Sequence, residues 1–505
     1  MHWTTDIAII GSGFGGAFAA HVLTETGLRV TLLERGPWRD TLPVRSMGIP
    51  ERAPLPRGVG MFSGLLRTLG ANAWLPEAMC LNRHGLFEFY LAEGVRIACS
   101  SGVGGGSHVW SGATVRPLVP GYWEDHAPGI SNDAMERHYL QAIDVLEAVR
   151  PTPEHRIPNL AAVRFRDSDV LAPLPPAPDA RLAYALPADP AHPRSRTTAA
   201  GVSRREVDYR RGDDGFLGSP AGGKATLDAA CLAGALQRGL AVYDLCEVTA
   251  LASRDDGGRP HHRVTFTDLR SGREDTLDAA YVVLGAGTLN TLRLLLKSAA
   301  RGHLRPMPAL GRRFGTNGDL FGFWDWNDPA LDLGVGLPTA GGVKLRDDPD
   351  PPVIGGGGWP SVDAYPLPRW LRTRIRRGSF IAGMGEDAMD GRVSLRGERL
   401  HVAFDPAHSP IFARLRRTFE AMGQRTGRRI CCPRVPITVH PMGGACLGAD
   451  AEHGVVDARG EVFGNPGLYV VDAAALPRAP GGPPSLAIAG WALHVAHGLA
   501  AHVAG

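Results

Sequence analysis

The sequence predicts an α/β protein in which a Rossmann-like dinucleotide-binding domain is combined with a second domain built on a mainly antiparallel sheet. Three stretches support this fold class. Residues 6–36 have the pattern of an apolar strand, a glycine-rich turn, a helix and a second strand. Residues 279–296 repeat the order of strand, small-residue turn and helix. Residues 310–430 alternate short strand-like pieces with Gly and Pro turns, which is typical of antiparallel sheets.

The first element is the N-terminal unit DIAIIGSGFGGAFAAHVLTETGLRVTLLERG. Gly11 permits a tight turn, Gly13 lets the backbone approach a pyrophosphate, and Gly16 lets helix and strand pack closely. The helix N-terminus offers free N–H groups to phosphates. Glu34 closes the second strand, where its carboxylate can accept hydrogen bonds from a ribose. The unit predicts a dinucleotide site without distinguishing NAD from FAD; the alternative is a Gly-rich turn in an unrelated βαβ unit.

Residues 37–95 carry Pro-rich turns and apolar side chains that include Met61, Phe62 and Trp74. A loop of this length indicates a lid or a channel wall, with a helical insertion packed on the core as the alternative. The next segment, SSGVGGGSHVWSG at 100–112, is so rich in glycine that its main chain can lie against a planar or phosphate-bearing ligand. Its position between two strand-like pieces favours a structured binding loop over a linker.

The pattern further along predicts helices over residues 132–149 and 225–239, strand structure over 241–252 and a closing apolar helix over 485–500. Residues 151–200 are rich in Pro and Ala and are expected to be irregular. The basic run between 369 and 377 favours a solvated helix face, with contact to an anionic surface or acidic substrate as the alternative.

Composition limits the class of protein. The chain has 505 residues, 44% of them apolar and 21% charged, and a net charge of +3, which is too small to indicate a nucleic-acid binder. The first strand begins so soon after Met1 that no signal peptide is expected, and no apolar run of roughly 18 residues indicates a membrane span. Seven cysteines without C-x-x-C spacing fit reduced thiols. We expect a cytoplasmic enzyme without a transmembrane segment and without a metal site.

The C-terminal region adds VHPMGG at 439–444, GLYVVDAA at 467–474 and PGGPP at 480–484. Together with IIGSGFGG, LLERG, GVGGGSHVWSG, GKATLDAACLAGAL, VVLGAGTLNTLRLLL and GTNGD, these motifs resemble, in order and spacing over nearly the whole chain, the glucose–methanol–choline (GMC) flavoprotein oxidoreductases, and within them the cholesterol-oxidase-like branch. The resemblance implies an FAD-dependent enzyme that oxidises a small-molecule alcohol by hydride transfer to the flavin and passes electrons to oxygen or another acceptor.

The resemblance also implies a division into domains. The FAD-binding domain would be discontinuous and comprise residues 1–45, 95–118, 222–310 and 432–505. Residues 46–94, 119–221 and 311–431 would form the substrate-binding domain and lid segments. The cofactor-binding residues carried over from the family are Gly11, Gly13, Phe14, Gly15, Gly16, Glu34, Arg35, Gly102, Gly105, Gly106, Trp110, Ser111, Gly112, Val248, Ala286, Gly287, Asp472, Ala473, Pro484 and Ser485.

His440 matches the active-site histidine of the family. Alcohol oxidation needs a partner for the hydroxyl proton while hydride leaves the carbon, and a neutral imidazole suits this task near pH 7. The alternative is a buried structural histidine.

Two positions depart from the cholesterol-oxidase pattern. The place of an active-site asparagine is taken by Pro483, so His440 is expected to lack its usual partner. The place of a catalytic glutamate aligns with Gly356, so steroid oxidation coupled to isomerisation is not supported. These departures favour, as an alternative function, a redox-neutral or lyase-type flavoenzyme on the same scaffold. An NAD-dependent dehydrogenase would leave the motifs at 100–112 and 467–474 unexplained.

The loop at 100–112 raises the question of covalent flavin attachment. Some relatives attach the flavin through a histidine in this loop, and their histidine aligns with Val109, one position beyond His108. We therefore expect non-covalent FAD, with His108 as a candidate for lining the substrate pocket. Trp110 is shared with sugar-oxidising relatives, which leaves the substrate class open.

Overall fold

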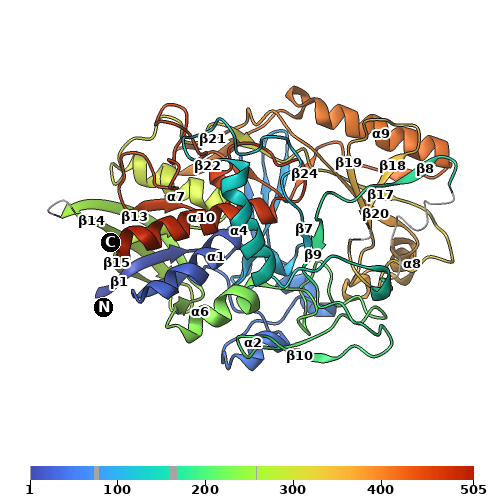
Figure 1. The fold of residues 1–505 in the computed structure, drawn as a ribbon, viewed down its shortest axis with the longest axis horizontal. Coiled ribbons are helices and arrows are strands. Elements are labelled where there is room, and N and C mark those ends of the chain that lie inside the picture. The colour runs from blue at the N-terminus through green and yellow to red at the C-terminus, as the bar shows by residue number, and fades with distance from the viewer. Residues whose placement is uncertain (1, 73–78, 158–167, 257–258, 340, 505) are drawn as a thin grey trace.

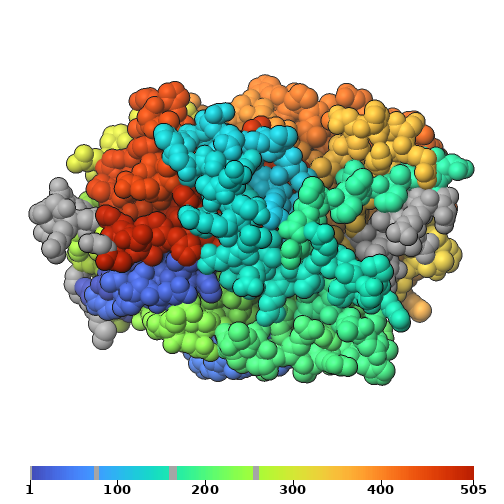
Figure 2. All heavy atoms as spheres, in the orientation of Figure 1, coloured from blue at the N-terminus to red at the C-terminus, as the bar shows by residue number. Residues whose placement is uncertain are grey.

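The computed structural model describes residues 2–72, 79–157, 168–256, 259–339 and 341–504. Figure 1 shows the two chain ends side by side at one edge of the molecule, next to the nucleotide-binding sheet, while the strands between residues 320 and 384 lie toward the opposite edge. In Figure 2 the cyan to green part of the chain covers the face between these two halves.

The nucleotide-binding half is a seven-stranded sheet. Its path contains, in spatial order, β12 (Ala241–Tyr243), β2 (Val30–Leu33), β1 (His2–Ile10), β15 (Arg273–Leu284), β14 (Arg259–Asp268) and β13 (Cys246–Asp256), with β26 (Leu468–Val470) also paired to β15. The pairs β12–β2, β2–β1, β1–β15 and β15–β26 are parallel, and the pairs among β13, β14 and β15 are antiparallel. Ile7, Ala8 and Ile9 are fully buried, as expected for a strand covered on both faces.

Both predicted strand–turn–helix units are present. Helix α1 (Phe14–Leu23) follows β1, and helix α7 (Thr288–Ala300) follows β15. Helix α1 packs against α10 (Ser485–Ala504), which also packs against α4 (Asn132–Val145). These contacts join the first and last parts of the chain into one layer.

Helix α10 is the long apolar helix predicted at the end of the chain. By length and composition it could cross a membrane, whereas 56% of its most apolar window is buried inside the fold. Trp491, Leu493 and Val495 have no exposed surface. The helix is apolar because it belongs to the core.

The substrate-side half is a six-stranded sheet, which confirms the predicted antiparallel arrangement. Its strands are, in spatial order, β23 (Ile430–Cys431), β17 (Leu320–Trp324), β20 (Ser379–Met384), β19 (Val353–Gly357), β18 (Gly342–Leu345) and β8 (Leu171–Leu174). Helix α9 (Pro410–Thr426) packs on β17 and β23. The prediction of irregular structure over 151–200 is wrong at β8, because this strand completes the sheet from a distant part of the sequence.

A third sheet includes part of residues 37–95. It contains, in spatial order, β24 (Ile437–Thr438), β6 (Arg96–Ser100), β5 (Phe87–Leu91), β3 (Leu66–Ala71) and β4 (Met79–Cys80), so the described part of the segment combines short strands with short helical pieces between residues 42 and 64. Phe62 is 81% exposed and Met61 only 4%. Trp74 lies outside the described residues. The pairing of β24 with β6 places the chain just before His440 beside the glycine-rich loop.

The remaining elements are short. The paired strands are β7 (Ala113–Thr114) with β9 (Arg181–Leu182), β10 (Ser195–Thr197) with β11 (Ser203–Arg205), β16 (Phe314–Gly315) with β25 (Met442–Gly443), and β21 (Arg392–Arg396) with β22 (Arg399–Ala403). The remaining α-helices of the described residues are α2 (Leu42–Ser46), α3 (Met61–Gly64), α6 (Ala233–Gln237), which follows the π-helical turn Asp228–Leu232, and α8 (Arg369–Arg376).

Two features of these elements bear on the sequence predictions. Helix α4 ends four residues earlier than predicted, close to Glu147, which has a left-handed φ of 49°. Arg372, Arg374 and Arg376 of α8 pair with Asp325, Asp332 and Asp363, as expected for a solvated helix face. The domain boundaries given above remain a prediction.

Gly16 provides a test of the close packing in the nucleotide-binding half. A Cβ atom added at Gly16 would lie 1.9 Å from the carbonyl oxygen of Gly11, and neither backbone can yield without moving a strand end. We expect Gly16→Ala to lower the free energy of unfolding by at least about 3 kcal/mol in urea titrations. Gly498→Ala in α10 is the control, because nothing lies within 4 Å of its added Cβ, and it should be neutral or stabilising. An unchanged midpoint for Gly16→Ala would contradict this packing.

Candidate active site

A cavity of about 1040 Å³ runs from the nucleotide-binding sheet to the substrate-side sheet. It brings together residues that are far apart in the sequence. The predicted site residues that line it are Gly11, Gly13, Phe14, Gly15, Glu34, Arg35, Gly102, Gly105, Gly106, Trp110, Ser111, Val248, Ala286, Gly287, Gly356, His440, Asp472, Ala473, Pro483, Pro484 and Ser485. Three predicted residues, Gly16, Gly112 and His108, do not line it.

The glycine turn after β1 has the geometry that a pyrophosphate cradle requires. Gly11 has a φ of +90°, and an added Cβ would lie 2.5 Å from the carbonyl oxygen of Gly285. At Gly13 and Gly106, which both line the cavity, an added Cβ would meet no protein atom within 4 Å. Helix α1 begins after Gly13 without a side-chain cap, so its first N–H groups are available to a ligand. These residues fit a dinucleotide with its pyrophosphate at the helix end.

Glu34 is buried and already accepts hydrogen bonds from the protein. Its Oε2 atom accepts from the backbone N of Ser12 (3.0 Å) and from Ser12 Oγ (2.6 Å), and its Oε1 atom accepts from the backbone N of Gly36 (2.7 Å). An ionised carboxylate has about four lone-pair sites, so capacity for a ribose hydroxyl remains. The glycine turn therefore fixes the predicted ribose acceptor in place.

Asp472 links the turn that follows β15 to the turn that follows β26. Its Oδ2 atom accepts from the backbone N of Gly287 (2.8 Å) and from Thr291 Oγ1 (2.5 Å), and its Oδ1 atom accepts from the backbone N of Ala474 (2.9 Å). Burial raises the pKa of Asp472 to about 6, although these hydrogen bonds act in the opposite direction. The carboxyl group thus holds the ends of β15 and β26 together beside the cavity.

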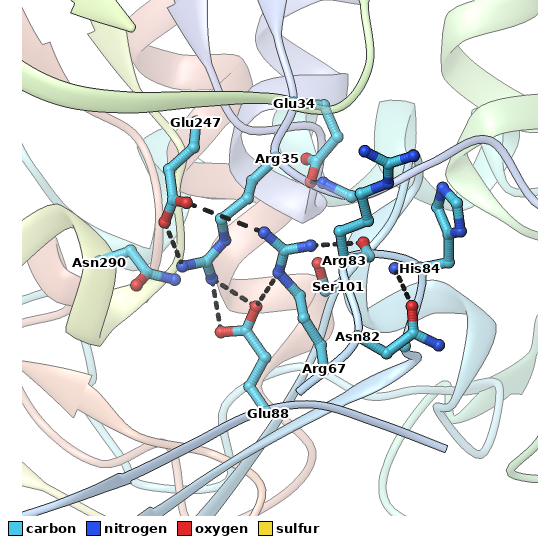
Figure 3. A network of polar contacts seen from close by, with 12 residues as sticks. Glu34, Arg35, Arg67, Asn82, Arg83, His84, Glu88, Ser101, Glu247 and Asn290 are labelled. Atoms are coloured by element: carbon cyan, nitrogen blue, oxygen red, sulfur yellow. Dashed lines mark hydrogen bonds and ion pairs between the residues drawn. The ribbon is translucent and has the colours of Figure 1, made fainter. Parts of the chain in front are cut away.

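Figure 3 shows a network of four charged side chains next to the end of β2, which the sequence did not reveal. Arg35 donates to both carboxylate oxygens of Glu88 and, at 3.2 Å, to Glu247 Oε1. Arg67, from β3, lies 3.4 Å from Glu88 and 3.9 Å from Glu247. Burial alone would lower the pKa of Arg35, but the two carboxylates outweigh burial and raise it. The network joins β2 and β13 of the nucleotide-binding sheet to β3 and β5 of the third sheet.

His440 stands where the cavity meets the substrate-side half, and its side chain is 21% exposed. Its Nδ1 atom lies 2.9 Å from Oδ1 of Asp319, which is fully buried. Pro483 takes the place of the usual partner of this histidine, and Asp319 gives the ring a polar partner from another element. Asp319 belongs to the predicted turn GTNGD, but its contact with His440 was missed because the two residues are 121 positions apart.

The same turn also holds the segment that contains Pro483. Asn317 has a left-handed φ of 59°, its Nδ2 atom donates to the carbonyl oxygen of Gly482 (2.9 Å), and its Oδ1 atom accepts from the backbone N of Gly481 (3.0 Å). Pro483 and Gly356 both line the cavity, and neither brings a polar side chain.

His108 is not a pocket residue. Its side chain has no exposed surface, and its Nε2 atom lies 2.7 Å from the carbonyl oxygen of Val103. Burial lowers its pKa, which favours a neutral ring. The neighbouring Val109 lines the cavity instead. At Gly112, an added Cβ would lie 2.2 Å from the ring of Tyr184, so this glycine serves packing.

The ammonium group of Lys224 holds the loop at 100–112 in place. Apart from its position in the motif GKATLDAACLAGAL, nothing in the sequence indicates this role. Its Nζ atom donates to the carbonyl oxygens of His108 (2.9 Å), Trp110 (3.0 Å) and Gly215 (2.6 Å). Burial lowers the pKa of Lys224 to about 7. Trp110 is further held by an edge-on contact with Phe14, with ring centroids 5.0 Å apart.

Charge is unevenly distributed along the cavity. The charged side chains Glu34, Arg35, Glu247, Arg293, Lys297 and Asp472 all come from elements of the nucleotide-binding half. The opposite end is walled by the aromatic residues Phe87, Phe89, Phe216, Phe321, Trp359, Tyr365 and Phe380. Phe216, Trp359 and Phe380 pack edge to face, with centroids 5.7 to 5.8 Å apart. The part of the cavity with charged side chains suits the polar end of a ligand, and the part with aromatic side chains suits an apolar ligand.

Comparison with known proteins agrees with this arrangement. Residues 402–492 match the family model GMC oxidoreductase, and residues 9–38 match the NAD(P)-binding Rossmann-like domain. A cholesterol oxidase of Mycobacterium tuberculosis (strain CDC 1551 / Oshkosh) is 28% identical over 559 residues, covering 96% of this chain and 89% of the relative. A cholesterol oxidase of Acinetobacter baumannii is 23% identical, covering 96% and 92%.

Solved structures show the same fold at lower identity. Pyridoxine 4-oxidase from Mesorbium loti superposes with a TM-score of 0.56 at 18% identity, covering 98% of each chain. A fungal aryl-alcohol oxidase superposes with a TM-score of 0.60 at 13% identity, covering 99% of each chain.

The charged network leads to a stability prediction. Glu88→Gln removes the carboxylate that lies between Arg35 and Arg67 and leaves both guanidinium groups buried beside one remaining acid. We expect a loss of about 3–5 kcal/mol in the free energy of unfolding. Glu136→Gln is the matched control, because Glu136 pairs with Arg116 while 45% exposed and should cost at most about 1 kcal/mol. Equal, small losses for both variants would show that the network does not stabilise the fold.

Proposed function

We propose that this chain, which belongs to the GMC oxidoreductase family, is an FAD-dependent enzyme that oxidises an alcohol to a carbonyl compound with His440 as the base. Family membership and the Rossmann-like domain imply FAD as the dinucleotide. The observation that carries the proposal is the single cavity that joins the dinucleotide-binding turns to His440.

The proposed reaction divides the alcohol's two hydrogens between two acceptors. A bound flavin supplies the hydride acceptor, and oxygen or another acceptor later removes the two electrons. Nε2 of His440 takes the hydroxyl proton as hydride leaves the carbinol carbon, so the C–O bond gains its double-bond character without a charged product. The N–H groups at the start of α1 and the glycines of the loop at 100–112 hold the cofactor, and the aromatic wall excludes water.

We propose that the cofactor is bound non-covalently. His108 is buried against Val103 and does not line the cavity, and the cavity position next to it is Val109, which cannot form a bond to flavin. We also propose a cytoplasmic location, which is supported by the seven unpaired cysteines.

The aromatic wall supports an uncharged alcohol with a large apolar group as substrate. The cavity end nearest the substrate-side sheet offers rings and main chain for apolar contact and, among its described lining residues, no charged side chain to recognise an ionic substrate. The names of two relatives, a cholesterol oxidase and an aryl-alcohol oxidase, are consistent with this class.

Pro483 and Gly356 support one alternative function. They remove the second polar group and the carboxylate of the cholesterol-oxidase pattern, which favours a redox-neutral or lyase-type flavoenzyme. The two functions differ in whether substrate reduces the flavin.

Anaerobic mixing with a panel of alcohols tests both the function and the substrate class. We expect sterols and aryl alcohols to bleach the flavin absorbance near roughly 450 nm, and sugars and charged alcohols to leave it unchanged. Bleaching by sugars alone would contradict the apolar substrate, and conversion of a substrate without any bleaching would favour the redox-neutral alternative.

The base is tested by His440→Ala. We expect this variant to retain flavin and to lower the rate of flavin reduction about 10²- to 10⁴-fold in stopped-flow measurements, because the hydroxyl proton loses its acceptor. His192→Ala is the control, since this histidine is 82% exposed and does not line the cavity. Undiminished reduction in His440→Ala would remove this residue from the mechanism.

A further inference from the structure

The imidazole of His440 is held from behind by a buried carboxylate. Asp319 Oδ1 lies 2.9 Å from His440 Nδ1, and the aspartate has no exposed surface. The other ring nitrogen, Nε2, has no hydrogen-bond partner among the described residues, and His440 lines the cavity. A base that takes a substrate proton through Nε2 must carry its own proton on Nδ1, which is the atom that faces the aspartate.

The carboxylate is fixed on both of its oxygens. Asp319 Oδ2 accepts from the backbone N of Val439 (3.0 Å) and from Thr438 Oγ1 (2.8 Å). Thr438 Oγ1 in turn accepts from the backbone N of His440 (2.9 Å). Side chain and backbone of the histidine are thus tied to the same carboxylate. Because the backbone N–H can only donate, an ionised Asp319 satisfies these contacts best.

The turn that presents Asp319 is itself held rigidly. Asp387 Oδ2 accepts from the backbone N of Thr316 (2.6 Å) and from Thr316 Oγ1 (2.7 Å). Two residues before Asp319, Asn317 is hydrogen-bonded to Gly481 and Gly482, directly before Pro483. One turn therefore sets the position of the histidine and of the segment that replaces the family's asparagine.

We propose that Asp319 is the positioning residue of the reaction, taking over the task that Pro483 cannot perform. It holds His440 in the tautomer with the proton on Nδ1, aims Nε2 into the cavity, and neutralises the imidazolium that forms when the hydroxyl proton arrives. The inference rests on the proposed function of His440, and it assigns a role to a residue that does not itself touch the substrate.

The first test compares Asp319→Asn with His440→Ala in the flavin-loaded enzyme. Asn keeps the size of the side chain but places an NH₂ group against donors and carries no charge. We expect the limiting rate of flavin reduction to fall about 10²- to 10⁴-fold, while the Kd for substrate changes less than about threefold. The double variant should be no slower than His440→Ala alone, because both residues act as one unit.

Asp278→Asn is the matched control for loss of a buried carboxylate. Asp278 is 5% exposed and pairs with Arg263 on β14, and it does not line the cavity. It should lose stability without changing the limiting rate. If Asp319→Asn reduces flavin at the wild-type rate while His440→Ala does not, the role of Asp319 is overturned and the proposed function stands. If His440→Ala also reduces flavin normally, the proposed function itself fails.

A second measurement does not depend on any variant of Asp319 folding or on turnover. The ¹⁵N chemical shifts of His440, assigned by the signal lost in His440→Ala, report which ring nitrogen carries the proton, with or without cofactor. We expect the Nδ1–H form in the wild-type protein. A proton on Nε2 in the neutral ring would overturn the proposal, because such a ring cannot take a proton from the cavity.

Discussion

The site depends on how closely the main chains of three parallel strands approach where they end. An added Cβ would lie 2.5 Å from Gly285 O at Gly11, 1.9 Å from Gly11 O at Gly16 and 2.5 Å from Val471 O at Gly15. Only glycine permits these distances, since any side chain would force the strand ends apart. The turns after β1, β15 and β26 consequently meet at one point, and each of them contributes predicted cofactor residues to one cavity. Asp472 then fixes this meeting point by accepting hydrogen bonds from two of the turns.

Positively and negatively charged side chains are present in equal number near the place where the three turns meet. Three arginines, Arg35, Arg39 and Arg67, lie near three carboxylates, those of Glu34, Glu88 and Glu247. Among the described residues, Arg39 donates only to carbonyl oxygens, those of His84, Gly85 and Ser101, and burial, with the nearby charge of Arg67, lowers its pKa to about 9. Its guanidinium lies behind the backbone of Gly102, where an added Cβ would be 2.9 Å from Nε. The glycine-rich loop therefore lies between the cavity on one side and the guanidinium group of Arg39 on the other.

The sequence predicts local features of this molecule well, because glycine spacing and strand–turn–helix order are encoded within some thirty residues. It predicts poorly whatever depends on long-range pairing. β8 joins a sheet whose other strands begin at Leu320, and Asp319 meets His440 across 121 positions. His108 and Val109 are adjacent in sequence, yet only Val109 lines the cavity. Composition cannot show which of two neighbouring residues in a short turn points toward the ligand. Pro483 marks a departure from the family pattern, but the sequence does not reveal which residue partners His440 instead, because Asp319 lies 121 positions away along the chain.

The position of that compensating carboxylate has a consequence for the pocket. A polar partner placed beside His440 would face the substrate and would have to be satisfied when an apolar molecule enters. Asp319 instead supplies the charge from the far side of the ring, where Thr438 and Val439 satisfy its second oxygen. Pro483 and Gly356 can then remain without polar groups, and the aromatic residues Phe321 and Phe380 line the same cavity as His440. Under the proposed mechanism, the departures from the family pattern and the apolar character of the cavity have one physical explanation: His440 is polarised from outside the pocket, so that the inside can stay apolar.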